Sequence, residues 1–184
     1  FAANNWKGIV IGFIVIFIAI IIAAVGYQVN NNMKANAANV IAAAETKEAL
    51  EKVVRDYASY PVVNSARIKL ALLYIKDKNY DKAIELYTII SKSADTPDEM
   101  RWRAALNVSY AMELKGQKEE AASGFATTAS QSSMSDAFKA EANYAAGRLY
   151  ASFNNKEKAA GFLKTASLSA LAPGAAGFWG DLAK

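Results

Sequence analysis

The sequence predicts an all-α protein, in which one N-terminal transmembrane helix precedes an α-solenoid of about three helix pairs plus a capping helix. Three observations support this fold class: an uncharged apolar run near the N-terminus, a pattern of small and large residues that recurs every 38 positions, and only three prolines in 184 residues. Few prolines, together with abundant Ala, Leu, Lys and Glu, favour helices throughout the chain.

The apolar run Gly8–Gly26 is long enough to cross a bilayer. Its nineteen residues carry no charge, and a helix of that length spans about 28 Å, close to the hydrocarbon thickness. We expect residues 1–27 to form the anchor, with Trp6, Lys7 and Tyr27 at the membrane interfaces, where aromatic and basic side chains gather.

Two alternatives to a retained anchor are less consistent with this run. A cleaved signal peptide usually has a shorter apolar region, and a pilin-like helix would carry an acid where this chain has Asn5. Lys7 on one side of the run favours a cytoplasmic N-terminus and a translocated C-terminal domain.

Small residues recur at four-residue spacing within the anchor. Gly8 and Gly12 form one such pair, and Ala19 and Ala23 form another. Each pair could let a second helix pack closely in the membrane, or could simply face lipid.

A polar neck, residues 28–45, links the anchor to a repeat domain at residues 46–184, and it is either a linker or a continuation of the helix.

Helix boundaries within the domain have recognisable chemistry. We expect a capping box with proline in the first turn at Thr96–Glu99, a helix end at Gly116, a helix start at Ser135-Asp136 and a break at Asn154-Asn155.

The repeat domain shows self-similarity between residues 79–87, 117–125 and 155–163. Each repeat has a turn residue, a small residue five positions later, a large residue four positions after that, and a preceding helix with its own small and large positions. The turn residues are Lys78, Gly116 and Asn154, the small residues after them are Ala83, Ala121 and Ala159, and the large residues are Tyr87, Phe125 and Leu163. On the preceding helices the small residues are Ala71, Ser109 and Gly147, and the large residues are Tyr74, Met112 and Tyr150. An earlier half-repeat is indicated by Ala49 and Val53. Small residues let paired helices approach, and stacking buries the faces left open.

The segment 70–90 resembles a tetratricopeptide repeat through Leu70, Ala71, Tyr74, Tyr80, Ala83 and Tyr87. The later repeats depart from that motif, with Lys118 and Lys156 in place of the post-turn tyrosine. The period of 38 exceeds the family's usual 34, which predicts longer loops around residues 91–96 and 130–134. The resemblance covers about Met33–Ala172, and Pro173–Lys184 is predicted to be a capping helix with Phe178, Trp179 and Leu182 closing the core.

The resemblance implies that the first helices of the pairs form a concave, protein-binding face. Carried over to this sequence, it places there Lys69, Leu72, Lys76, Arg103, Asn107, Tyr110, Tyr144 and Arg148. Basic and aromatic groups together suit an extended peptide of acidic character. The alternative is that these are ordinary solvated helix residues. Of the family's carboxylate-clamp residues only Asn107 is matched.

Several classes of function are excluded or disfavoured by composition. The chain has no cysteine and no histidine, which removes Ser-His-Asp and Cys-His catalysis and makes a zinc site improbable. Basic and acidic residues nearly balance outside the anchor, so a nucleic-acid partner is not expected. No phosphate-binding motif occurs, and the acids Glu119, Glu120, Asp136 and Glu141 are interpreted as helix-start residues. We therefore expect no enzymatic activity, no cofactor, no metal and no small-molecule substrate.

The architecture of one anchor, a neck and a small repeat domain is similar to that of YfgM-type ancillary subunits of the bacterial Sec translocon. The entry into the first repeat through Tyr60-Pro61, Ser65-Ala66 and Leu70-Ala71 supports the likeness. The resemblance implies a single-pass bacterial inner-membrane protein with a periplasmic domain, whose partners are other proteins, namely membrane-complex subunits or secreted polypeptides, and the lipid bilayer. The alternative is an accessory scaffold subunit of a stable secretion, respiratory or photosynthetic complex.

Overall fold

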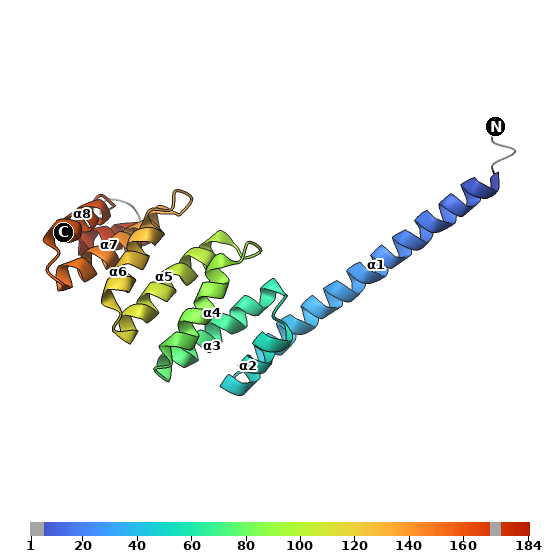
Figure 1. The fold of residues 1–184 in the computed structure, drawn as a ribbon, viewed down its shortest axis with the longest axis horizontal. Helices are drawn as coiled ribbons and strands as arrows, with labels where there is room; N and C mark the ends of the chain where they lie inside the picture. Colours follow the sequence, from blue (N-terminus) through green and yellow to red (C-terminus); the bar gives the residue numbers. More distant parts are fainter. Residues whose placement is uncertain (1–5, 170–173) are drawn as a thin grey trace.

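The computed structural model describes residues 6–169 and 174–184, and the side chains of residues 15–169 and 174–184; every regular element in these ranges is helical. Figure 1 shows one long helix projecting from a row of shorter helices stacked side by side. In chain order the elements are α1 (Trp6–Ala43), α2 (Lys47–Asp56), the short 3-10 helix η1 (Pro61–Val63), α3 (Asn64–Lys76), α4 (Tyr80–Lys92), α5 (Asp98–Lys115), α6 (Lys118–Ala129), α7 (Asp136–Ser152), α8 (Lys156–Ser167) and α9 (Ala175–Leu182).

Helix α1 joins the apolar run to the repeat domain without a break. Its 38 residues correspond to about 57 Å of helix. The stretch Val15–Ala43 is long and apolar enough to cross a membrane, with a mean hydropathy of 1.5 over 18 residues and none of that window buried. The neck at residues 28–45 is therefore mostly a helical continuation of the anchor, as one of the two sequence interpretations had it.

The last turns of α1 belong to the packing of the solenoid. Ala37, Ile41 and Ala44 are buried there, and Asn36 Nδ2 donates a hydrogen bond of 3.2 Å to the hydroxyl of Tyr57. These contacts fix the direction in which α1 leaves the domain (Figure 1).

The end of α1 and helix α2 form a helix pair that precedes the three predicted ones. Buried Ala37 lies 34 residues before buried Ala71, and buried Val53 lies 34 residues before buried Tyr87. The predicted half-repeat at Ala49 is thus the second helix of a pair whose first helix is the C-terminal end of α1.

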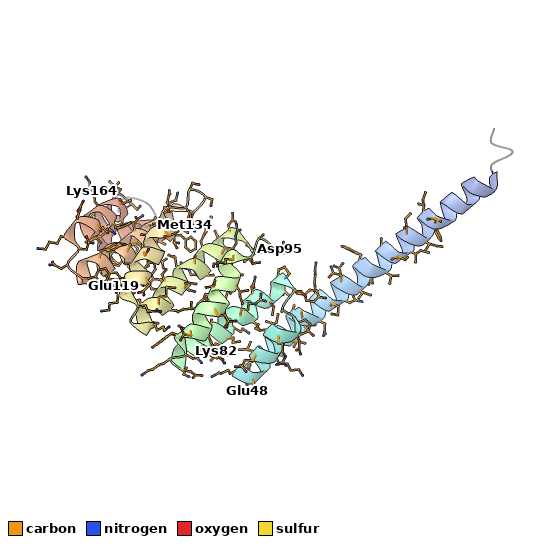
Figure 2. The ribbon with its side chains drawn as sticks, in the orientation of Figure 1. Glu48, Lys82, Asp95, Glu119, Met134 and Lys164 are labelled. Carbon is orange, nitrogen blue, oxygen red and sulfur yellow. The ribbon has the colours of Figure 1, made fainter. Side chains whose placement is uncertain are left out.

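The remaining pairs are α3/α4, α5/α6 and α7/α8, and each helix packs on the next one in the chain. Figure 2 shows Glu48, Lys82 and Glu119, near the turns within pairs, along one edge of the stack, and Asp95 and Met134, in the loops between pairs, along the opposite edge. These loops, residues 93–97 and 130–135, lie where the longer period predicted them.

Turns within the three predicted pairs share one backbone conformation. Lys78, Gly116 and Asn154 have φ of 59°, 93° and 59°, in the left-handed region that closes a helix. The next residue in each case, Asn79, Gln117 or Asn155, donates its N–H to the carbonyl of Tyr74, Met112 or Tyr150 at 2.8–2.9 Å. The alignment of these turns by sequence is confirmed, as are the helix end at Gly116, the helix start at Ser135-Asp136 and the break at Asn154-Asn155.

The core consists of two clusters joined along the stack. One gathers buried side chains from α1 to α5 around Leu70, Tyr74 and Ile90, and the other gathers those from α5 to α7 around Phe125 and Leu149. The small positions predicted to allow close approach are all buried: Ala71, Ser109 and Gly147 on first helices, and Ala83, Ala121 and Ala159 on second helices.

The predicted capping box at Thr96–Glu99 is wrong. Helix α5 begins at Asp98, Pro97 lies at its N-cap position rather than in its first turn, and no side chain caps it. The hydroxyl of Thr96 instead accepts a 2.6 Å hydrogen bond from Asn64 Nδ2 in a buried position. A long-range partner on α3 has replaced the local one, because burial of the Asn64 amide requires an acceptor.

The C-terminal capping helix is confirmed, but of its three predicted packing residues only Trp179 is partly buried. Helix α9 packs on α7 and α8 through buried Ala176, Gly177 and Gly180. Phe178 is 57% exposed and Leu182 48% exposed, whereas Trp179 is half-buried. The small residues let the α9 backbone approach its neighbours closely, which turns the large side chains outward. Pro173 lies outside the described residues.

Candidate partner-binding groove

A groove of about 600 Å³ lies between helices α5, α7 and α9, and we call it the α5/α7/α9 groove. Its lining combines three aromatic rings with one ion pair and otherwise small residues: Arg103, Ala137, Phe138, Glu141, Gly174, Ala175, Phe178 and Trp179. It therefore lies on the face formed by first helices, at the end of the stack that α9 closes.

The aromatic wall of the groove is held by neighbouring rings. Trp179 packs against Tyr144 with ring centroids 5.6 Å apart and against Phe178 at 5.0 Å, and Phe138 meets Trp102 edge-on at 5.7 Å. Contacts of this kind hold each ring in place. Because Phe178 stays largely exposed, the groove offers a rigid apolar surface to a partner.

The ion pair at the groove is built around Glu141, whose exposed fraction is only 4%. Its Oε1 accepts a hydrogen bond of 2.7 Å from Arg103 Nη1 and one of 3.0 Å from the Tyr110 hydroxyl. The Arg103 guanidinium also lies 4.7 Å from the ring centre of Phe138. Burial, reinforced by the Glu141 carboxylate, raises the pKa of Tyr110, which keeps its phenol protonated as a donor.

A second ion pair lies farther along the same two helices. Arg148 donates from Nη1 and Nη2 to the two carboxylate oxygens of Glu113, at 2.8 and 2.7 Å. The hydrogen bonding to Glu113 is the main reason that the pKa of Arg148 is raised. This fork-like pairing between α5 and α7 neutralises most of the charge that Arg148 could offer to a ligand.

Half of the predicted binding residues come together at this end of the solenoid. Arg103 lines the groove. Tyr144 supports the groove through Trp179, and Tyr110 does so through Glu141. Arg148 continues the same face on α7, whereas Asn107 is half-buried on α5.

The other three predicted residues, Lys69, Leu72 and Lys76, are exposed on α3 and do not line the groove. Lys69 Nζ lies 3.5 Å from the carbonyl oxygen of Ile41 at the end of α1. Their surface therefore adjoins the anchor helix and not the aromatic groove.

Glu141 is the site residue that sequence reasoning placed wrongly, because it was interpreted as a helix-start acid. It lies beyond the first turn of α7 and faces α5. One signal could have found it: Arg103 and Glu141 are 38 residues apart, and residues one period apart occupy equivalent places on adjacent first helices. Opposite charges at such positions predict an ion pair between repeats.

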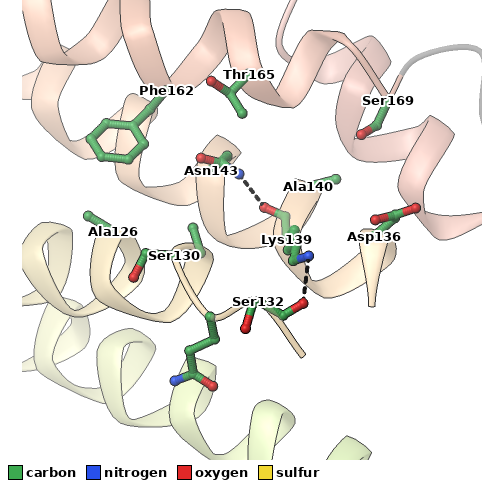
Figure 3. A pocket seen from close by; sticks show the side chains of 12 residues that line it. Ala126, Ser130, Ser132, Asp136, Lys139, Ala140, Asn143, Phe162, Thr165 and Ser169 are labelled. Carbon is green, nitrogen blue, oxygen red and sulfur yellow. Dashed lines mark hydrogen bonds between the residues drawn. The ribbon is translucent and has the colours of Figure 1, made fainter. Parts of the chain in front are cut away.

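The other side of α7 borders a polar cleft of about 490 Å³, shown in Figure 3. Ser130, Ser132 and Thr165 supply hydroxyls to it. Asn143 Nδ2 donates to the carbonyl of Lys139 at 2.8 Å, and Lys139 Nζ lies 3.2 Å from the carbonyl of Ser132. The polar groups of Asn143 and Lys139 are thus used within the fold.

Metal-binding groups are not assembled in the described part of the chain, where no cluster of three or more His, Cys, Asp or Glu side chains occurs. Comparison with known proteins adds no assignment: no protein-family model, curated protein or solved structure matches the chain. Function must therefore be inferred from the chemistry of the α5/α7/α9 groove and from the membrane-length helix.

Proposed function

We propose that this chain is a membrane-anchored protein-binding module that captures an extended segment of a partner polypeptide in the α5/α7/α9 groove. The observation that carries the proposal is the aromatic wall formed by exposed Phe178 and half-buried Phe138 and Trp179, beside the Arg103–Glu141 pair. Rigid aromatic side chains in a recess are the groups that contribute most to protein–protein binding.

The partner segment in this proposal is apolar or aromatic rather than strongly acidic. Arg103 and Arg148 are both engaged by carboxylates of the chain itself, so little net positive charge faces the groove. Among the predicted basic residues, Lys69 and Lys76 lie on α3, away from the aromatic wall. Acidic residues that flank the bound segment of the partner would have to extend to α3 in order to pair with Lys69 and Lys76.

The setting we propose is a bacterial inner membrane with the solenoid in the periplasm. The long apolar α1 supports membrane attachment, and the likeness of the overall arrangement to ancillary translocon subunits supports the compartment. In that setting the groove would receive polypeptides emerging from a translocon and pass them to chaperones. The proposed activity requires no cofactor and no catalysis.

A stable scaffold subunit is the second candidate, and one observation favours it. Helix α1 continues into the solenoid, where Ala37 and Ile41 are buried, so the anchor and the binding face are rigidly connected. Such coupling suits a subunit that holds one partner at a fixed height above a membrane complex.

The test is photo-crosslinking from the groove with the full chain in native membranes. A photoreactive residue replaces Phe178, and a matched one replaces Leu168, which is 78% exposed and does not line the groove. We expect residue 178 to yield adducts with many secreted polypeptides and residue 168 to yield few. A single stoichiometric adduct would favour the scaffold, and equal adducts from both positions would contradict binding in this groove.

A second arm tests the aromatic wall directly. Trp179→Ala removes the ring that links Tyr144 to Phe178, so adduct formation at residue 178 is expected to fall several-fold. Leu168→Ala is the control, because it removes an exposed apolar side chain that does not line the groove. Unchanged adducts with Trp179→Ala would show that the partner does not use the aromatic wall.

A further inference from the structure

An exposed apolar stripe runs down α1 from the membrane segment into the solenoid. Ile22, Val29, Met33 and Val40 recur at spacings of seven, four and seven residues, which places them on one side of a helix with 3.6 residues per turn. Val29 is 55% exposed and Met33 42% exposed, although both lie beyond the apolar run. At its solenoid end this α1 stripe meets the side that the solenoid covers: Ala37 and Ile41 are buried there, and Val40 is half-buried against the core.

The α1 stripe ends in a groove of about 490 Å³ between α1 and α2. Small and β-branched residues form its floor, and two charged residues and a tyrosine form its rim: Val40, Ala43, Ala44, Ala49, Lys52, Val53, Asp56 and Tyr57. This is the open end of the solenoid, where no earlier helix pair covers the first one. Val40 belongs to both the stripe and the groove, so the two form one continuous surface.

The sequence of the exposed part of α1 makes an unsupported helix unfavourable. Asn30, Asn31 and Asn32 follow one another, and asparagine is about 0.6 kcal/mol less favourable than alanine in a helix. All three are exposed, so packing within the chain does not compensate for this preference. Packing against another helix along the stripe would stabilise the segment, as it does for most helices in water.

We propose that the occupant of this surface is a second copy of the chain, paired in parallel and in register along the α1 stripe. Two copies anchored in one bilayer by the same apolar run have the same residues at the same depth. Each stripe residue then meets its own equivalent across a two-fold axis, as in a symmetric dimer. The spacing of the stripe is the spacing that brings two parallel helices together.

Charge placement is consistent with self-pairing. Lys34 is the only charged residue from Gly8 to Ala44. It directly follows Met33, and because consecutive helical residues are about 100° apart around the axis, it lies away from the stripe. At the groove rim, Lys52 and Asp56 are one helical turn apart on α2. A two-fold axis can place Lys52 of one copy beside Asp56 of the other, twice per dimer, without like charges meeting.

The absence of cysteine from the sequence allows a disulfide scan of the full chain in native membranes. Single cysteines replace Val29, Met33 and Val40 on the stripe, and Asn31 and Ala38, exposed on the opposite side of α1, as matched controls. Under mild oxidation we expect covalent dimers at the stripe positions to exceed those at the controls several-fold.

The outcomes of the scan are distinct. Equal yields around the helix, or a maximum at residues 31 and 38, would overturn the proposed pairing. Adducts at stripe positions with a different protein, in place of the dimer, would replace the second copy with another membrane partner. As an independent check, Met33→Lys should convert nanodisc-embedded dimers to monomers, whereas Asn31→Lys should not; two-copy particles with Met33→Lys would also overturn the proposal.

Discussion

Gly147 on α7 lies so close to Leu163 on α8 that residue 147 has no room for a side chain. A Cβ at this position would come within 2.7 Å of Leu163 Cγ and 3.0 Å of the Leu163 backbone nitrogen. The equivalent positions in the preceding pairs hold Ala71 and Ser109.

Substitution Gly147→Ala is expected to destabilise the solenoid by about 1–3 kcal/mol, because the added methyl group requires α7 and α8 to separate. The measurement is denaturant unfolding of the full chain in detergent, followed by tryptophan fluorescence. Gly161→Ala on α8 is the control: nothing lies within 4 Å of its added Cβ, and replacing an exposed helical glycine should stabilise by about 0.5–1 kcal/mol. Equal effects of the two changes would contradict the close contact.

The contact between Gly124 and Ser109 predicts coupling between two substitutions. A Cβ on residue 124 would lie 2.5 Å from Ser109 Oγ but 3.5 Å from Ser109 Cβ. Gly124→Ala alone should therefore destabilise, and Ser109→Ala should relieve much of that loss. We expect an interaction free energy of about 0.5–3 kcal/mol in the double-mutant cycle, and strictly additive effects would show that the hydroxyl is not the obstacle.

The buried Tyr74 predicts how stability changes at alkaline pH. Its hydroxyl donates a 2.5 Å hydrogen bond to Glu51 Oε1, and burial, followed by this bond, raises its pKa to about 12. An unfolded tyrosine ionises near pH 10, so the stabilising contribution is complete below that pH and is lost as pH rises towards 12.

The check is a series of unfolding curves between about pH 9 and 12. Tyr74→Phe should lower stability at neutral pH, because Glu51 loses its donor, but should also flatten the decline above pH 10. If the variant keeps the same decline as the unmodified chain, Tyr74 is not the group responsible.

Thr96 provides a test of the buried hydrogen-bond network that replaced the expected helix cap. Asn64 donates to Thr96 and accepts from Arg67 Nη1, each at 2.6 Å. Thr96→Val keeps the shape but leaves the Asn64 amide without its acceptor, which should cost about 1–3 kcal/mol of unfolding free energy. Thr96→Ser keeps the hydroxyl and should cost clearly less; similar losses from both would indicate that the methyl group, not the hydrogen bond, matters.

Features set by residues close in sequence were predictable. Lys78, Gly116 and Asn154 end their helices by the same backbone conformation, and their spacing already aligned them. The buried small residues Ala83, Ala121 and Ala159 followed the same spacing. A helix turn depends on a few neighbouring residues, so its signal survives in the sequence alone.

Features that depend on how helices approach one another were not predictable in the same way. Thr96 carries a helix-cap signature but serves Asn64, 32 residues away. Phe178 carries a core signature but is exposed, because Ala176, Gly177 and Gly180 take the buried side of α9. The Thr96 hydroxyl could cap α5 or pair with α3, and either side of α9 could face the solenoid. In both cases the contact with a distant helix decided the outcome.

The sequence by itself determined that this protein is helical, that it carries a membrane-length apolar helix and that three of its helix pairs repeat every 38 residues, because periodicity and turn chemistry are local properties. Only the tertiary structure decided that the end of α1 supplies the first helix of the solenoid, that Glu141 is buried between Arg103 and Tyr110, and that aromatic rings of α7 and α9 line one groove. These relationships arise from close packing between surfaces distant in the chain, where shape and the pairing of buried polar groups select one arrangement.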